Sequence, residues 1–227
     1  MGSYSFFTIF ISVLSIVAAI GLLISHSSHV KTPPGQGASC RGGVDIHALQ
    51  WDARWGNLRF GGRTLASTGS GILSVVNAIY ACSGNFPEPS VIAQWAYSEK
   101  FFNYYDAGCR PGMVEAAARA FGSRYGFRYA GSSTNLFSSA VKDHCRTGGA
   151  CVAQVNRHFI TIADYDLTTG KYLVLDCAPN CGIRTGVTAL HHCWKTPQEL
   201  TNGHYSIHVT RCWLYAKDQG AGCSATT

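Results

Sequence analysis

Apolar residues with helical spacing follow a stretch of small, polar residues near the first third of the chain. The apolar positions fall at i, i+3, i+4 and i+7, and they are Ile72, Val75, Val76 and Ile79. This spacing predicts one buried stripe of a helix, with Ser74 and Asn77 on its other faces. The run Cys82-Ser83-Gly84-Asn85 is typical of a helix C-terminus. Ser70 is therefore expected at or just before the first turn of a helix that is anchored in the core.

The expected helix start around Ser70 suits negative charge. The first N–H groups of a helix lack intrahelical partners, and the helix dipole adds positive potential there. Such an end stabilises a thiolate or an oxyanion, which are the species that a nucleophilic enzyme must hold. The alternative is that Ser70 is only the N-cap of the helix.

The remaining pattern separates helices from strands. Helical spacing covers residues 89–101 and 111–125, with Pro111 as a first helical residue, and a short helix is expected at 136–144. Strand-like segments follow at 151–155, 158–165, 171–176 and 206–215, with a hairpin turn at 166–170. Helices first and antiparallel strands afterwards predict an α+β fold with segregated halves.

The N-terminal part has a different character. Residues 6–24 form an almost unbroken apolar run, long enough to span a bilayer, and residues 1–29 contain no Lys, Arg, Asp or Glu. We expect a signal peptide or a signal-anchor helix in 1–29, a linker in 30–43, a folded domain in 44–217 and a flexible tail in 218–227. The run exceeds a usual signal-peptide core and no A-x-A site follows it, which argues against cleavage, whereas Ser25-His26-Ser27 offers an alternative small-x-small cleavage site.

The cysteine content and the distribution of charge indicate the cellular compartment and the class of binding partner. All ten cysteines lie after residue 39, and an even count favours an oxidising compartment with up to five disulfides. The sequence leaves their connectivity open; two short loops that disulfides could close are Cys177–Cys181 and Cys145–Cys151. Lys31 and Arg41 follow the apolar run, which alone would favour a cytoplasmic domain. Since the cysteines outweigh that signal, we expect a secreted or single-pass membrane-anchored protein, exposed extracellularly or in a lumen. The net charge of +6 is scattered, so no nucleic-acid partner is expected.

A histidine and an aspartate are expected to meet at one end of the predicted hairpin. His158 begins one strand, and Asp176 ends its partner. A carboxylate bonded to one ring nitrogen fixes the imidazole tautomer and frees the other nitrogen to activate a nucleophile. Taken singly, each has a plainer role, as a surface histidine or a turn-capping aspartate. Together with Ser70 they make a candidate catalytic set.

Four separated elements of the chain resemble one enzyme family. They are Gln50-Trp51-Asp52-x-Arg54-Trp55-Gly56, Phe60-Gly61-Gly62-x-Thr64-Leu65, Gly69-Ser70-Gly71-Ile72-x-Ser74-x-x-Asn77-Ala78, and His158-Phe159 followed by Tyr172-Leu173-Val174-Leu175-Asp176. In this order they are similar to the motifs of the C39-like cysteine peptidases, a papain-like branch. The resemblance covers roughly residues 44–217.

The resemblance implies a papain-like fold with a Cys–His–Asp triad. By position it implies that Gln50 is an oxyanion donor, His158 the general base and acid, and Asp176 the orienting carboxylate. The chain departs from the family at two places: Ser70 occupies the nucleophile position, and Cys177 stands where the family usually has proline. A hydroxyl cannot be ionised in advance as a thiol can, so Ser70 is expected to be a poor nucleophile.

Three functions follow from these observations. The first is a catalytically impaired member that keeps a cleft for a peptide or peptide-like ligand. The second is an active hydrolase that uses Ser70, His158 and Asp176, or a Cys-to-Ser variant of an active cysteine peptidase. The third is a disulfide-stapled, non-catalytic surface module. No cofactor and no metal is expected, because the spacing of His191, His192 and Cys193 with Cys177 and Cys181 matches no standard zinc pattern.

Overall fold

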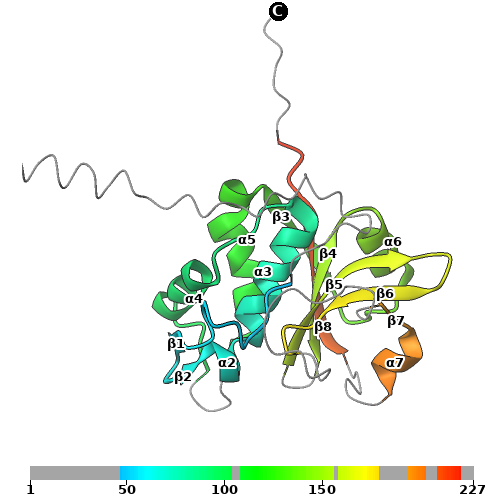
Figure 1. The fold of residues 1–227 in the computed structure, drawn as a ribbon. Coiled ribbons are helices and arrows are strands. Elements are labelled where there is room, and N and C mark those ends of the chain that lie inside the picture. The colour runs from blue at the N-terminus through cyan, green and yellow to red at the C-terminus, as the bar shows by residue number, and fades with distance from the viewer. Residues whose placement is uncertain (1–46, 104–107, 156–157, 179–193, 203–208, 221–227) are drawn as a thin grey trace, which may run out of the picture. The chain divides into compact units, whose positions relative to one another are not determined.

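The helix predicted after Ser70 is the central helix of the folded part. In the computed structural model, which describes residues 47–103, 108–155, 158–178, 194–202 and 209–220, it is α3, Ser70–Ser83. Every residue from Ser70 to Cys82 is buried, so burial extends beyond the predicted apolar stripe to Ser74 and Asn77 on the other faces. The helix is enclosed because it packs on the sheet through β4 (Ala150–Val155), β5 (His158–Asp166) and β8 (Val209–Lys217) and on helices α4 (Pro89–Ser98) and α5 (Gly112–Tyr125) (Figure 1). Gly84, in the left-handed conformation, ends it as predicted.

The other helices are α2 Leu65–Thr68, α4 Pro89–Ser98, α5 Gly112–Tyr125, α6 Ser139–Arg146 and α7 Pro197–Thr201. Helices α4, α5 and α6 lie close to their predicted positions, whereas α2 and α7 were not predicted. Pro111 is the N-cap of α5 rather than its first helical residue. Helix α6 begins later than predicted because the Ser138 hydroxyl caps it by accepting a hydrogen bond from the Val141 N–H.

The strands form a two-stranded and a six-stranded antiparallel sheet. Strands β1 Arg59–Phe60 and β2 Arg63–Thr64 pair as a small hairpin. The larger sheet has the order β3-β8-β4-β5-β6-β7, with β3 Phe127–Ser133, β4 Ala150–Val155, β5 His158–Asp166, β6 Lys171–Leu175, β7 Trp194–Lys195 and β8 Val209–Lys217. Its central strands were predicted; β3 and β7 were not. The protein is thus a mixed helix-and-sheet fold with a small antiparallel sheet, consistent with α+β.

The two faces of the large sheet bury separate clusters. One cluster includes α3 and Phe159 of β5, and the other includes α6 and the neighbouring Ile160. The described residues belong to one compact unit, Gly37–Thr227. Among them no helix is long and apolar enough to cross a membrane; the apolar run 6–24 lies outside the described residues.

The six cysteines in the described part of the chain are all free thiols. The expected Cys145–Cys151 disulfide is therefore wrong. The Cys145 sulfur faces the carbonyl of Ile162, and Cys151 instead contacts Cys212 on the adjacent strand β8. Cys177 is also free, and its expected partner Cys181 lies outside the described residues.

Candidate active site

The hairpin β5–β6 brings His158 and Asp176 together, as the sequence predicts. His158 is the first residue of β5, and Asp176 directly follows the end of β6. His158 Nε2 lies 2.7 Å from Asp176 Oδ1, and the Ala178 N–H donates to the same oxygen at 2.9 Å. Asp176 is 2% exposed and His158 is half-buried. The two side chains are therefore already hydrogen-bonded, with the carboxylate buried and the imidazole partly exposed.

The charge of this pair follows from its contacts. Burial by itself would raise the pKa of Asp176, but the His158 hydrogen bond and charge, with the Ala178 N–H, hold that pKa below its ordinary value. The carboxylate is therefore ionised at neutral pH. Since Nε2 is committed to Asp176, Nδ1 is the His158 nitrogen left to face a nucleophile.

Ser70 is the first residue of α3 and not its N-cap. The N-cap is Gly69, whose carbonyl accepts the Leu73 N–H at 2.9 Å. The Ser70 side chain is largely buried, and it makes no hydrogen bond to any residue that the structure describes, His158 included. Ser70 is thus at the helix start, as the apolar spacing predicts, but its hydroxyl is not bonded to the imidazole.

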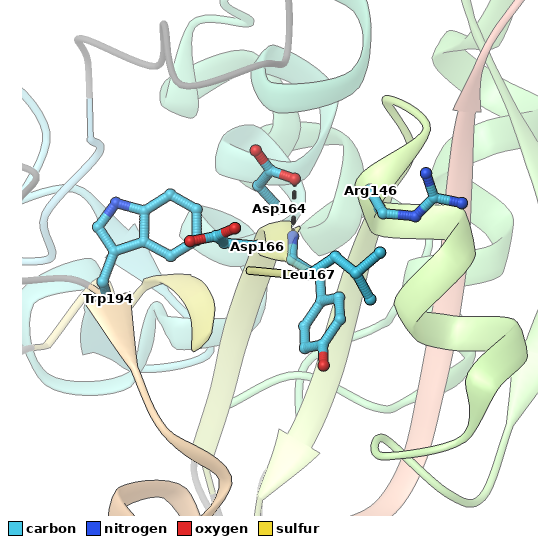
Figure 2. A pocket seen from close by; sticks show the side chains of 6 residues that line it. Arg146, Asp164, Asp166, Leu167 and Trp194 are labelled. Carbon is cyan, nitrogen blue, oxygen red and sulfur yellow. Dashed lines mark hydrogen bonds between the residues drawn. The ribbon is translucent and has the colours of Figure 1, made fainter. Parts of the chain in front are cut away.

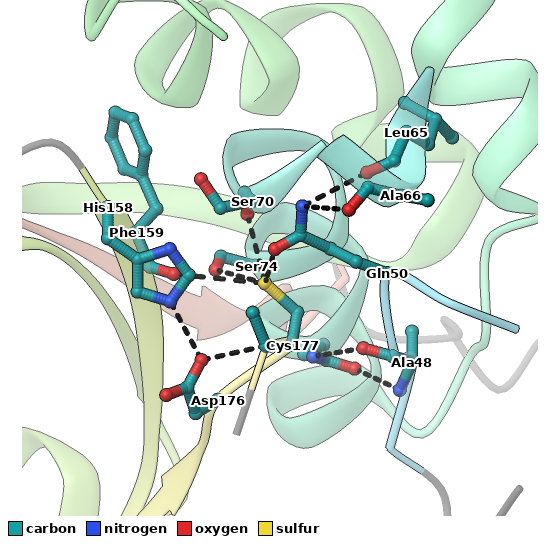
Figure 3. A network of polar contacts seen from close by, with 12 residues as sticks. Ala48, Gln50, Leu65, Ala66, Ser70, Ser74, His158, Phe159, Asp176 and Cys177 are labelled. Atoms are coloured by element: carbon teal, nitrogen blue, oxygen red, sulfur yellow. Dashed lines mark hydrogen bonds and ion pairs between the residues drawn. The ribbon is translucent and has the colours of Figure 1, made fainter. Parts of the chain in front are cut away.

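The sulfur of Cys177 lies between the segments that carry the candidate residues. It is 3.6 Å from Gln50 Oε1, 3.7 Å from the Ser70 carbonyl oxygen and 3.9 Å from the Phe159 carbonyl oxygen. Ser70 and the residue that follows His158 therefore flank one sulfur atom (Figure 3). Cys177 is fully buried, and burial raises the pKa of its thiol well above the ordinary value. Buried and protonated, it is not a nucleophile in this arrangement.

Gln50 reaches the same site from the segment before α2. Its Nε2 donates to the carbonyls of Leu65 at 3.0 Å and Ala66 at 3.4 Å, and its Oε1 faces the Cys177 thiol. The amide N–H groups are thus directed at α2 (Figure 3). To stabilise an oxyanion at Ser70, Gln50 would have to release one of these carbonyls.

Sequence reasoning missed His47, which lies three residues before Gln50. His47 is 4% exposed and hydrogen-bonds to the Asp176 backbone. Burial lowers its pKa to about 4, against the opposing effects of the Asp176 charge and of that hydrogen bond. No local motif distinguishes this histidine, because its partner is distant in sequence.

Acid should destabilise the fold through His47. The unfolded chain binds a proton on this residue near pH 6.5, whereas the folded chain binds it only near pH 4. Because the unfolded state holds more protons in that window, acidification favours unfolding. We expect the contribution of His47 to the free energy of unfolding to fall by about 3 kcal/mol between pH 6.5 and 4. Urea denaturation at a series of pH values measures this, and a His47→Asn variant with the same pH dependence would contradict it.

Two other features bear on ligands. Donor atoms of His158, Asp176 and Cys177 lie within 4.8 Å of one another, but Nε2 and Oδ1 already bond to each other and the thiol is protonated. A separate cavity of about 440 Å³ opens at the opposite end of the β5–β6 hairpin, near Asp166, Leu167 and Trp194 (Figure 2). It is distant from Ser70, because β5 runs from His158 at one end to Asp166 at the other.

No protein-family model matches the chain, and no curated protein matches it at a significant level. The likeness to C39-like peptidases therefore rests on the four sequence motifs alone.

Proposed function

We propose that this protein is a peptidase C39-like domain protein whose cysteine-type peptidase activity is impaired or lost and which binds a peptide or peptide-like ligand at the Ser70 site. The observation that carries the proposal is the 2.7 Å bond between His158 and Asp176 beside a helix start that presents a serine. In this proposal the fold is papain-like. Attachment to a membrane through residues 6–24 and exposure outside the cytoplasm remain predictions of the sequence.

Impaired catalysis follows from the chemistry of Ser70. An alcohol has to lose its proton during attack, and it needs a hydrogen bond to His158 for that transfer. That bond is not made between the described side chains, and the Gln50 N–H donors are bonded to Leu65 and Ala66. A small misplacement of reacting atoms costs on the order of 10²-fold in rate. The missing Ser70–His158 hydrogen bond and the engaged Gln50 donors both lower the expected rate of hydrolysis.

The second candidate is a working hydrolase that uses Ser70, His158 and Asp176. It is favoured by the hydrogen-bonded His158–Asp176 pair and by His158 Nδ1, which bonds to no residue in the described part of the chain. The third candidate, a disulfide-stapled module, loses support because the described cysteines are free.

A fluorophosphonate probe separates the first two candidates. We expect the full chain to show no labelling at Ser70 by peptide mass spectrometry, because the hydroxyl is not activated. Ser70→Ala serves as the blank. Labelling at Ser70 that disappears in His158→Ala would contradict impaired catalysis and support the hydrolase.

Peptide binding is tested by retention of a random-sequence peptide library on the full chain. Ser70→Trp should reduce retention because the indole fills the space beside the helix start. The matched control is Ser67→Trp, since Ser67 is an exposed residue three positions earlier. Equal retention by the two variants would contradict a ligand site at Ser70.

A further inference from the structure

His47 lies against Asp176 from a segment that neither forms a helix nor joins the large sheet. Residues 47–50 precede α2, and all four are buried. The His47 ring hydrogen-bonds to the Asp176 backbone, and the two groups are close enough for the carboxylate charge to act on the ring. A buried histidine of this kind needs such a partner, because an unsatisfied polar group in the interior is costly.

The segment that carries His47 is fixed at several points. The Asn77 side chain bonds both polar groups of Ala48, accepting its N–H at 2.7 Å and donating to its carbonyl at 3.2 Å. The Gln50 N–H donates to the Cys177 carbonyl at 2.8 Å. The segment therefore runs along residues 176–177, with His47 bonded to one and Gln50 to the other.

Asp176 depends on such support. It lies beyond the last residue of β6, Leu175, so the strand ladder does not hold its backbone. Its Oδ1 must nevertheless keep the His158 hydrogen bond, and its buried Oδ2 has no hydrogen-bond partner among the described residues. A shift of the Asp176 backbone would move Oδ1 away from His158 Nε2 and release the imidazole.

Resting on the function proposed above, we propose that His47 is a positioning residue whose neutral ring anchors the Asp176 backbone so that the carboxylate orients His158. Neutrality matters because a charged ring beside Asp176 would compete with His158 for the carboxylate. Burial keeps the ring neutral, since it lowers the pKa of His47 to about 4. Asp176 is the titratable group that acts on the ring.

The test follows the His158 Nε2 proton by NMR in the full chain, a readout that needs no catalytic activity. In the wild type this proton should be protected from exchange with water by its bond to Asp176. His47→Leu, which removes the ring donor, should abolish the protected signal. His47→Asn, which keeps an N–H donor, should restore it. In the wild type the His47 ring should also stay unprotonated down to about pH 4.

His144→Gln is the matched control. His144 also bonds a backbone carbonyl through its ring, that of Tyr215 at 2.8 Å, but it belongs to α6 on the other face of the sheet. Its substitution should leave the His158 signal intact. A protected signal in His47→Leu, an equal loss in His144→Gln, or protonation of His47 near pH 6.5 would each overturn the proposal. If His47→Leu does not fold, the proposal is still tested by the protected His158 signal in His47→Asn and by the pH titration of His47 in the wild type. Failure here leaves the Ser70 tests untouched.

Discussion

Replacing Ser70 with cysteine should raise peptide hydrolysis by at least about 10²-fold over the wild type. The thiol would stand at the start of α3 beside His158, where a helix end and an imidazolium lower a thiol pKa from about 8.5 into the range of ~3.5–7.5. A resting thiolate needs no proton transfer during attack, whereas the Ser70 hydroxyl does. Fluorogenic peptide substrates, assayed with purified full chain, measure the gain.

The matched control for this gain is Ser67→Cys, which adds a thiol at an exposed position of α2 without His158 beside it. It should stay at the wild-type rate. The gain in Ser70→Cys should also vanish when His158→Ala is added. A variant that folds, as judged by circular dichroism, and still shows no hydrolysis would contradict a retained papain-like site.

Replacing Asn77 with leucine should lower the free energy of unfolding by about 4 kcal/mol. Asn77 is fully buried in α3, and its side chain satisfies both the N–H and the carbonyl of Ala48. Leucine would leave both backbone groups buried without a partner, each at roughly 1–3 kcal/mol. Urea denaturation at neutral pH measures the change.

The control for that substitution is Asn85→Leu, just beyond the end of the same helix. Asn85 also donates to a backbone carbonyl, that of Tyr125 at 3.0 Å, but it is exposed. Water can replace this bond, so the loss should stay below about 1 kcal/mol. Equal decreases in the free energy of unfolding for the two variants would show that the hydrogen bonds between Asn77 and Ala48 do not stabilise the fold more than the exposed Asn85 bond does.

The local pattern predicted most elements because each carries its own signal. Apolar spacing placed α3, and the alternation after residue 150 placed β4, β5 and β6. Strand β3 was missed because its sequence, Phe127–Ser133, is polar and contains a glycine, so only its pairing with β8 shows it to be a strand. The apolar spacing predicted only one buried stripe of α3; the burial of Ser74 and Asn77 on its other faces depends on the distant residues Cys177 and Ala48, which their side chains contact.

The candidate site was predictable where one hairpin builds it. The distance along the chain from His158 to Asp176, with a turn between, was sufficient to bring them together. The hydrogen bonds that the Gln50 side-chain amide donates could not be predicted, because the accepting carbonyls belong to α2, fifteen and sixteen positions away along the chain. The even number of cysteines predicted disulfides, yet Cys151 and Cys212, whose side chains contact each other across β4 and β8, are both free thiols. Contacts between elements, rather than local pattern, decide these features.

The pH dependence of alkylation in Ser70→Cys tests the central claim most directly. If the serine occupies a nucleophile position governed by His158, the introduced thiol should react with iodoacetamide as a thiolate well below pH 8.5. Adding His158→Ala should return the profile to that of an ordinary thiol, near ~8.5. An introduced thiol that titrates near 8.5 whether or not His158 is present would contradict the account.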